Sequence, residues 1–335
     1  MKTDTCMNMR AVVDRYESGG LYSGAVLVER GGEELLREAR GLAHRGFGVP
    51  NAVDTRFDTA SLGKLFTAAA AFRLVKGGLL ALDERVSEIV DLSGTMIPDD
   101  VSIGHCLTHS SGIADDADEE AGEDYEDIWR AKPCYTARET SDLLANFVYK
   151  EPLFKAGTAA RYNNCAYVLA GLAMEKRTGL PFRSIVEREV TGPLGLSDTG
   201  YFAKDGVDER VAEGYSSIED AEGRHVGFRK NIYSYPPVGS PDAGILTTVR
   251  DLSRLFRGIE SEAYLGGELR DRFLSPVIDA FTLKSGHLRR YGYCLEHDFL
   301  PAGGLLRYCK DGCNPGVAAI AMRYPAADGF IAILA

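Results

Sequence analysis

One apolar stretch limits this chain to folds that can enclose a helix on all sides. Residues 65–75 are mostly apolar and include four consecutive alanines, which are strong helix formers. Gly77-Gly78 follows as a stop signal. The pattern predicts a buried helix from about Ser61 to Lys76, because a helix that is apolar all round needs protein on every face.

Ser61 and Lys64 lie in the first turn of this predicted helix and share one of its faces. The free backbone N–H groups and the positive end of the helix dipole favour an oxyanion there and disfavour a charged lysine. A serine beside such a lysine is a nucleophile with its own base. The alternative is an N-capping Ser61 with a solvated Lys64, and a single S-x-x-K does not separate the two.

Composition sets broad limits on the class of protein. The chain has 335 residues, of which 45% are hydrophobic and 26% charged, enough for two layered sub-domains. Its net charge of −11 argues against nucleic acid or an anionic membrane as partner. The start of the chain lacks an export signal, no run is long enough to span a membrane, and the seven cysteines are scattered and odd in number. We therefore expect reduced thiols and a cytoplasmic protein.

The order of the predicted elements indicates an α+β fold. Strand-like runs near both ends flank a helical middle, which predicts one antiparallel sheet built from both chain ends. We expect a discontinuous sheet domain over residues 1–60 and 200–335, a mainly helical domain over 61–199, and an active site in the cleft between them.

Local signals place the remaining elements. A hairpin is predicted through Gly31-Gly32, and antiparallel strands are expected to close the chain. A first helix is predicted to end near Gly19-Gly20, and three later helices are predicted over Thr136 to Val148, Cys165 to Arg177 and Thr248 to Ile259. The predicted closing strands span Leu305 to Cys309, Val317 to Tyr324 and Phe330 to Leu334.

Nine acidic residues crowd residues 115–127. Such a run is usually a solvated loop, and the alternative is a lid that attracts cations or substrate. The nine are Asp115, Asp116, Asp118, Glu119, Glu120, Glu123, Asp124, Glu126 and Asp127.

Two further motifs could join Ser61. Tyr162-x-Asn164 stands just ahead of a predicted helix, where a phenol and an amide can point into a cleft, although a half-buried tyrosine and an N-capping asparagine would give the same pattern. Lys310-Asp311-Gly312 ends a predicted strand. Each motif is weak alone.

Together the three motifs resemble those of the penicillin-recognising serine hydrolases, which include class C β-lactamases, D-alanyl-D-alanine carboxypeptidases, and related esterases and D-aminopeptidases. Residues 57–61, 107–112, 162–171 and 315–316 follow in the order of that family, so the resemblance covers nearly the whole chain. It implies the β-lactamase/DD-peptidase-like fold and catalysis through an acyl-enzyme.

The resemblance also implies residue roles. Ser61 would attack an acyl carbonyl. Lys64, either neutral or sharing a proton with Tyr162, would accept the hydroxyl proton of Ser61. Tyr162 would then pass this proton to the leaving group. The backbone N–H groups of Ser61 and Cys313 would form the oxyanion hole.

The binding residues follow from the same resemblance. Asn164 would orient Lys64 and the substrate amide, and Lys310 would add positive potential beside Tyr162. Asp311, which precedes Gly312, stands where penicillin-binding members carry a threonine or serine, which counts against carboxylate-bearing lactams if it faces the cleft. Members of the family usually add a helix after the last strand, so either further residues or another chain is expected to cover that face.

We therefore expect a serine hydrolase acting on small ester, amide or peptide substrates, without a cofactor or metal. The cysteine and histidine spacings lack a four-ligand zinc constellation, and His109 is expected to be structural. The enzymatic alternatives are a β-lactamase or D-alanyl-D-alanine carboxypeptidase and an acyltransferase, and the non-enzymatic one is an acyl-trapping sensor. An oligomer is compatible with the sequence.

Overall fold

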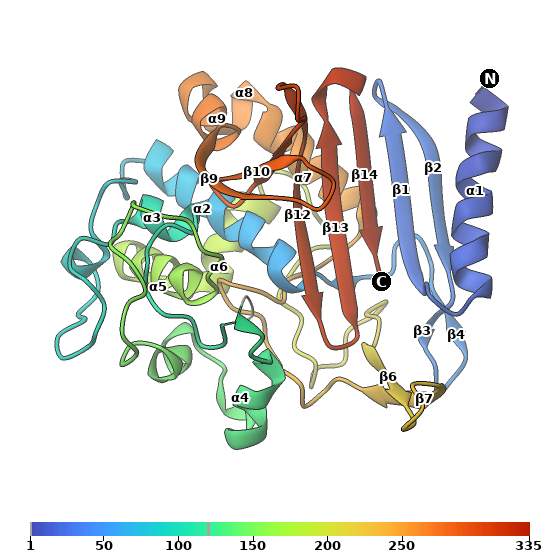
Figure 1. The fold of residues 1–335 in the computed structure, drawn as a ribbon, viewed down its shortest axis with the longest axis horizontal. Coiled ribbons are helices and arrows are strands. Elements are labelled where there is room, and N and C mark those ends of the chain that lie inside the picture. The colour runs from blue at the N-terminus through green and yellow to red at the C-terminus, as the bar shows by residue number, and fades with distance from the viewer. Residues whose placement is uncertain (1, 119–120) are drawn as a thin grey trace.

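The computed structural model describes residues 2–118 and 121–335 (Figure 1). Its helices are α1 Lys2–Ser18, α2 Lys64–Lys76, α3 Ile103–Leu107, α4 Tyr125–Ala131, α5 Cys165–Thr178, α6 Phe182–Val186, α7 Val249–Glu260, α8 Glu262–Leu265 and α9 Gly267–Phe273. The strands are β1 Gly24–Arg30, β2 Glu33–Arg40, β3 Leu42–His44, β4 Val49–Pro50, β5 Phe57–Asp58, β6 Tyr215–Glu219, β7 His225–Lys230, β8 Leu246–Thr247, β9 Pro276–Thr282, β10 Leu288–Gly292, β11 Glu296–Phe299, β12 Leu305–Asn314, β13 Val317–Tyr324 and β14 Gly329–Leu334.

Within the described residues, eight strands form one antiparallel sheet in the order β2-β1-β14-β13-β12-β11-β10-β9. The first and last parts of the chain meet within this sheet, where Leu27 of β1 lies opposite Ala332 of β14. This arrangement confirms the predicted α+β fold with a sheet drawn from both chain ends.

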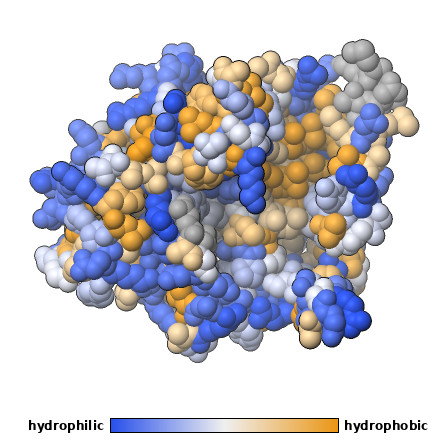
Figure 2. All heavy atoms as spheres, in the orientation of Figure 1, coloured by the Kyte–Doolittle hydropathy of each residue, from blue (hydrophilic) through white to orange (hydrophobic). Residues whose placement is uncertain are grey.

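The two faces of the sheet have different surroundings. On one face α7 packs against β14 and β1, and the rings of Phe256 and Phe330 lie 5.2 Å apart. On the other face Ile320, Ile331 and Ile333 are only half-buried, and Figure 2 shows an apolar surface over β13, β14 and β1. Whether a further segment or another chain covers this face stays a prediction.

The central helix is buried as predicted. A 3-10 turn, Ala60–Gly63, leads into α2, and every residue from Leu65 to Phe72 is buried. α2 packs against α5, and α5 also contacts α3. Figure 1 shows these helices as a layer beside the sheet. The search of the described residues for a helix long and apolar enough to cross a membrane found none.

Most predicted ends agree with the structure, and one predicted helix is wrong. Thr248 caps α7 by accepting the Asp251 N–H at 3.2 Å, and α5 ends at Gly179 in the left-handed region, with φ 68°. The expected helix from Thr136 to Val148 is instead two 3-10 segments, Cys134–Thr136 and Thr140–Asn146. The reciprocal cap is made by Glu139 and Asp142, three residues later than predicted, and it opens the second of these segments.

The closing strand that carries Lys310 is longer than predicted. β12 runs through to Asn314, and only Pro315 and Gly316 separate it from β13. Its pairing with β11 ends at Cys309, so its last five residues have β13 on one side and the Thr59–Leu62 segment on the other. This open end of β12 lies next to the start of α2.

Candidate active site

Ser61 and Lys64 meet where the 3-10 turn passes into α2. Lys64 is fully buried, and its Nζ donates to Ser61 Oγ at 3.1 Å, to Asn164 Oδ1 at 2.7 Å and to the Asp242 carbonyl oxygen at 2.7 Å. An ammonium has three N–H donors, so these three acceptors satisfy a charged Lys64 completely.

The pKa of Lys64 bears on the proton that the sequence analysis discussed. Burial disfavours its ammonium, but the interactions with Tyr162 and Asp242 outweigh burial and the opposing charge of Lys310, so the pKa of Lys64 lies above its usual value. This direction disfavours a neutral Lys64, and the expected alternative, a proton shared with Tyr162, stays a prediction. Asp242, which the sequence reasoning missed, lies on a loop between β7 and β8 and carries no motif that could have marked it.

Tyr162 lies between two ammonium groups. The Nζ atoms of Lys64 and Lys310 are 5.1 and 5.0 Å from the centre of its ring. The ring stacks on His109, with centroids 4.4 Å apart and planes inclined by 28°. His109 is buried, its Nδ1 accepts the Asn163 N–H at 3.1 Å, and its pKa is lowered far below the usual value by burial and by the two lysines. A neutral His109 therefore forms one wall of the site.

Lys310 reaches this site from β12. Its side chain is 1% exposed, and Nζ donates to Glu296 Oε1 at 2.7 Å and to Asp311 Oδ1 at 3.2 Å. Burial disfavours the ammonium, but Glu296 and Tyr162 outweigh it and raise the pKa of Lys310 well above its usual value. The Asp311 carboxylate, on a side chain that is 57% exposed, thus lies at the open rim beside Lys310.

Gly312 allows β12 to approach the nucleophile. A Cβ at this position would lie 2.1 Å from the Thr59 carbonyl oxygen and 2.8 Å from the Ser61 nitrogen, closer than any side chain permits. Backbone contact at Gly312 brings the following residue, Cys313, to the backbone of Ser61. The structure therefore brings together Ser61, Lys64, Tyr162, Asn164 and the 310–313 segment.

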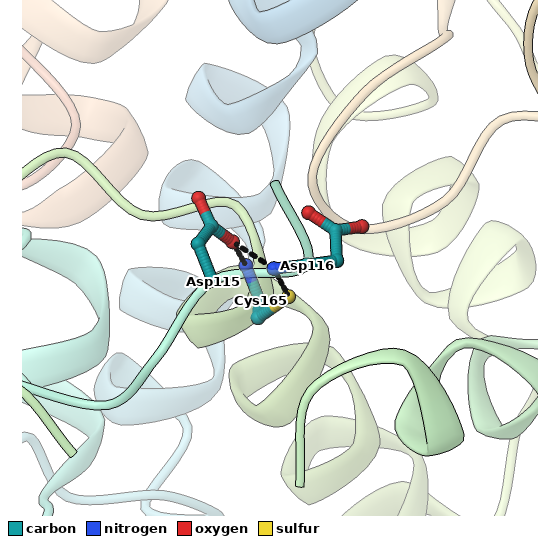
Figure 3. Close-up of side chains that lie close together, drawn as sticks. All are labelled: Asp115, Asp116 and Cys165. Atoms are coloured by element: carbon teal, nitrogen blue, oxygen red, sulfur yellow. Dashed lines mark hydrogen bonds between the residues drawn. The ribbon is translucent and has the colours of Figure 1, made fainter. Parts of the chain in front are cut away.

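Asp115 is a site residue that the sequence reasoning missed. Its carboxylate accepts the backbone N–H of Asn164 at 2.9 and 3.0 Å, just before α5. It also accepts the backbone N–H of Cys165 at 3.0 Å (Figure 3). Asn164 Nδ2 also donates to Asp115 Oδ2 at 3.3 Å. This bond points Asn164 Oδ1 towards Lys64 and fixes which end of the amide faces the lysine.

The acidic run is accordingly not a uniform solvated loop. Asp115 and Asp116 are half-buried, the latter donates its backbone N–H to Cys165 Sγ at 3.2 Å, and residues 119–120 lie outside the described part of the chain. Burial and neighbouring carboxylates raise the pKa of Asp116 and that of Cys165 well above their usual values. Asp115, Asp116 and Cys165 lie close together, but the raised pKa values of Asp116 and Cys165 oppose the loss of protons that binding a metal ion requires.

The fold corresponds to one structural class, that of penicillin-binding proteins. The penicillin binding protein of Bacillus halodurans superposes with a TM-score of 0.87 and 31% identity, over 96% of this chain and 94% of that chain. The model of the Beta-lactamase family matches residues 9–335, and the chain belongs to this family.

Curated relatives give the same assignment. Esterase EstB of Burkholderia gladioli is 33% identical over 224 residues, which are 65% of this chain and 56% of the esterase. Penicillin-binding protein 4* of Bacillus subtilis is 23% identical over 97% of this chain and 70% of its own length. The chain thus matches little more than half of the esterase, and the resemblance predicted from the motifs is confirmed at the level of the family.

Proposed function

We propose that this protein is a serine hydrolase that forms a covalent acyl-enzyme at Ser61 and acts on small esters or amides. The observation that carries the proposal is the 3.1 Å contact between Lys64 Nζ and Ser61 Oγ. Its site would lie in the cleft between a sheet domain, residues 1–60 and 200–335, and a mainly helical domain, 61–199. Likeness to an esterase and to penicillin-binding proteins supports this chemistry.

A charged Lys64 changes how the proton is handled in this proposal. An ammonium has no lone pair for the Ser61 proton, so the base is the Lys64 and Tyr162 pair, which holds one proton fewer when the site is active. Ser61 Oγ attacks the carbonyl carbon as its proton enters the pair. Tyr162 then donates a proton to the leaving group, and the pair takes one from water during deacylation.

The backbone provides the oxyanion site in the same proposal. The N–H groups of Ser61 and Cys313 would donate to the carbonyl oxygen as it becomes negative, each worth about 3 to 4 kcal/mol. Gly312 makes this possible, since any larger residue would separate the two segments. Asn164 would hold Lys64 and the substrate amide, and Lys310 would lie on the leaving-group side.

Asp311 favours ester or amide hydrolysis over the β-lactamase and D-alanyl-D-alanine carboxypeptidase alternatives. Its carboxylate beside Lys310 would repel a substrate carboxylate and partly neutralise the cation that attracts one. Acyl transfer to an alcohol or amine and acyl trapping by a sensor remain the other candidate functions. The cytoplasmic location expected from the sequence is also part of the proposal.

Labelling and turnover test the proposal together. The protein would be treated with a fluorophosphonate, a panel of p-nitrophenyl esters and a chromogenic cephalosporin, while intact mass and product release are followed. We expect both labelling and ester turnover, and we expect Ser61→Ala to remove both. Ser285→Ala is the control and should retain both, because Ser285 is an exposed serine that lies beside His287. A permanent acyl adduct from an ester or from the cephalosporin would indicate a sensor, rapid cephalosporin turnover a β-lactamase, and fluorophosphonate labelling elsewhere would refute the role of Ser61.

A further inference from the structure

A cavity of about 340 Å³ lies at the lower end of the sheet in Figure 1, between the β12–β13 turn and β6. Its wall includes Phe57 and Asp58 of β5, Lys204, Tyr235 and Val317 of β13. This volume is at the small end of the range for pockets that bind organic ligands.

The cavity is continuous with the segments that form the active site. β5 pairs with β8 and runs directly into the turn that holds Ser61, and the Asp58 carboxylate accepts the Ala60 N–H at 2.8 Å. A smaller hollow shares Asp58, Lys204 and Tyr235 with the cavity and reaches Asn314, the residue after Cys313. A group extending from the carbonyl carbon at Ser61 along the end of β12 would therefore enter this space.

The direction identifies which part of the substrate the cavity would receive. Lys310 begins and Asn314 ends the open stretch of β12, and Tyr162, the proposed proton donor to the leaving group, lies beside Lys310, with Nζ 5.0 Å from its ring centre. The leaving group must face that donor, so the acyl group extends the other way, towards Asn314 and Val317.

Lys204 gives the cavity its chemical character. Its Nζ lies 3.1 Å from the centre of the Tyr235 ring and 3.4 Å from Asn231 Oδ1, so an aromatic face and an amide oxygen lie next to its ammonium. Burial lowers the pKa of Lys204 to about 8, although Asp58 opposes this effect. A half-buried cation in such surroundings gains from an incoming anion.

The wall carries carboxylates as well as cations. Glu213 is paired with Lys230 at 2.7 Å, Asp208 is exposed, and Asp58 accepts a backbone N–H and attracts Lys204 without forming an ion pair with it among the described residues. A second cation, Arg45, lies 3.6 Å from the centre of the Phe228 ring and adds positive charge to the same wall.

We propose that the cavity binds the acyl part of the substrate and that Lys204 recognises a carboxylate at its far end. The substrate class is thus a monoester or monoamide of a dicarboxylic acid. The proposal rests on the proposed hydrolase function, because it places the acyl group relative to Ser61.

Matched ester pairs test it. The p-nitrophenyl esters of pentanoic, hexanoic and octanoic acid would be compared with the mono-p-nitrophenyl esters of glutaric, adipic and suberic acid. For each length the ratio of kcat/KM, carboxylate ester over neutral ester, is measured in the wild type, in Lys204→Met and in Lys284→Met, an exposed lysine in the β9–β10 turn. We expect the ratio to fall about tenfold in Lys204→Met at the best length and to be unchanged in Lys284→Met. An equal ratio in all three proteins would overturn the proposal.

A binding measurement separates this proposal from the hydrolase itself. Calorimetry of Ser61→Ala with monomethyl suberate, with and without Lys204→Met, needs no turnover. If no ester is hydrolysed but Lys204→Met still weakens binding about tenfold, the hydrolase proposal fails and the proposal of a carboxylate-binding cavity stands. If neutral esters are hydrolysed and neither the ratio nor binding changes, the cavity proposal fails and the hydrolase stands.

Discussion

Replacing Gly312 by alanine is the most direct test of how the site is assembled. The added Cβ would lie 2.1 Å from the Thr59 carbonyl oxygen, 2.7 Å from the Leu62 nitrogen and 2.8 Å from the Ser61 nitrogen. Non-bonded heavy atoms settle at roughly 3.5 to 4.0 Å, so β12 and the Ser61 turn must separate by about 1 Å. All three contacts are with backbone, and no side-chain rotation can relieve them.

That separation should be expressed mainly in catalysis. A displacement of about 1 Å costs on the order of 100-fold in rate, and loss of one oxyanion donor costs about 100- to 1000-fold. We therefore expect Gly312→Ala to lower kcat/KM for a neutral p-nitrophenyl ester by about 100- to 1000-fold and to slow fluorophosphonate labelling of Ser61 in parallel.

Gly227→Ala is the matched control for this change. Gly227 lies in β7, and a Cβ there has no neighbour within 4 Å, so this variant should keep wild-type kinetics. Tm and circular dichroism of both variants establish that they are folded. A folded Gly312→Ala protein with activity within about threefold of wild type would refute the proposed oxyanion geometry.

Three further changes follow from the same site. Asp115→Ala should lower kcat/KM about 10- to 100-fold, because Asn164 loses its orientation. Asp124→Ala removes the cap of α4, so it should cost about as much stability as Asp115→Ala, roughly 0.5 to 2 kcal/mol, and leave the kinetics normal. Equal kinetic effects of the two changes would contradict the positioning role of Asp115. Asp116→Asn should raise Tm by about 2 °C or more at pH 7 and lose this gain near pH 4. Burial and Asp115 raise the pKa of Asp116 in the folded state, so ionisation of Asp116 favours unfolding as the pH rises above about 4. A Tm difference independent of pH would exclude this cause. Asp311→Thr should speed acylation by a carboxylate-bearing cephalosporin by about 5-fold or more, followed by intact mass, and no change would show that the carboxylate at the rim does not contact substrate.

Sequence patterns predicted the parts of the fold that depend on short-range signals. The apolar run of α2, the glycine stop of α5 and the cap of α7 each lie within the element that they define. The 3-10 segments before α5 were missed, because Thr136 and Glu139 satisfy a capping pattern whose true partner is Asp142. Local pattern alone does not decide between two overlapping caps.

The site was predictable only in part for a related reason. S-x-x-K and the family's order of motifs predict Ser61, Lys64 and Tyr162, but the acceptors that hold Lys64 lie on Asn164 and on the carbonyl oxygen of Asp242, which are distant in sequence. Asp115 looks like the first residue of a solvated acidic run until α5 places two free N–H groups beside it. The only local hint is its position directly after the buried Ile113 and Ala114.

The pairing of β1 with β14 also determines when the sheet can be completed. During synthesis the first hairpin emerges long before β14, its neighbour in the sheet. Pairings of such long sequence separation form slowly and leave strand edges open in the meantime. The nascent chain therefore carries the proposed nucleophile without its oxyanion partner until β12 has emerged, and the open edges are prone to aggregation during that interval.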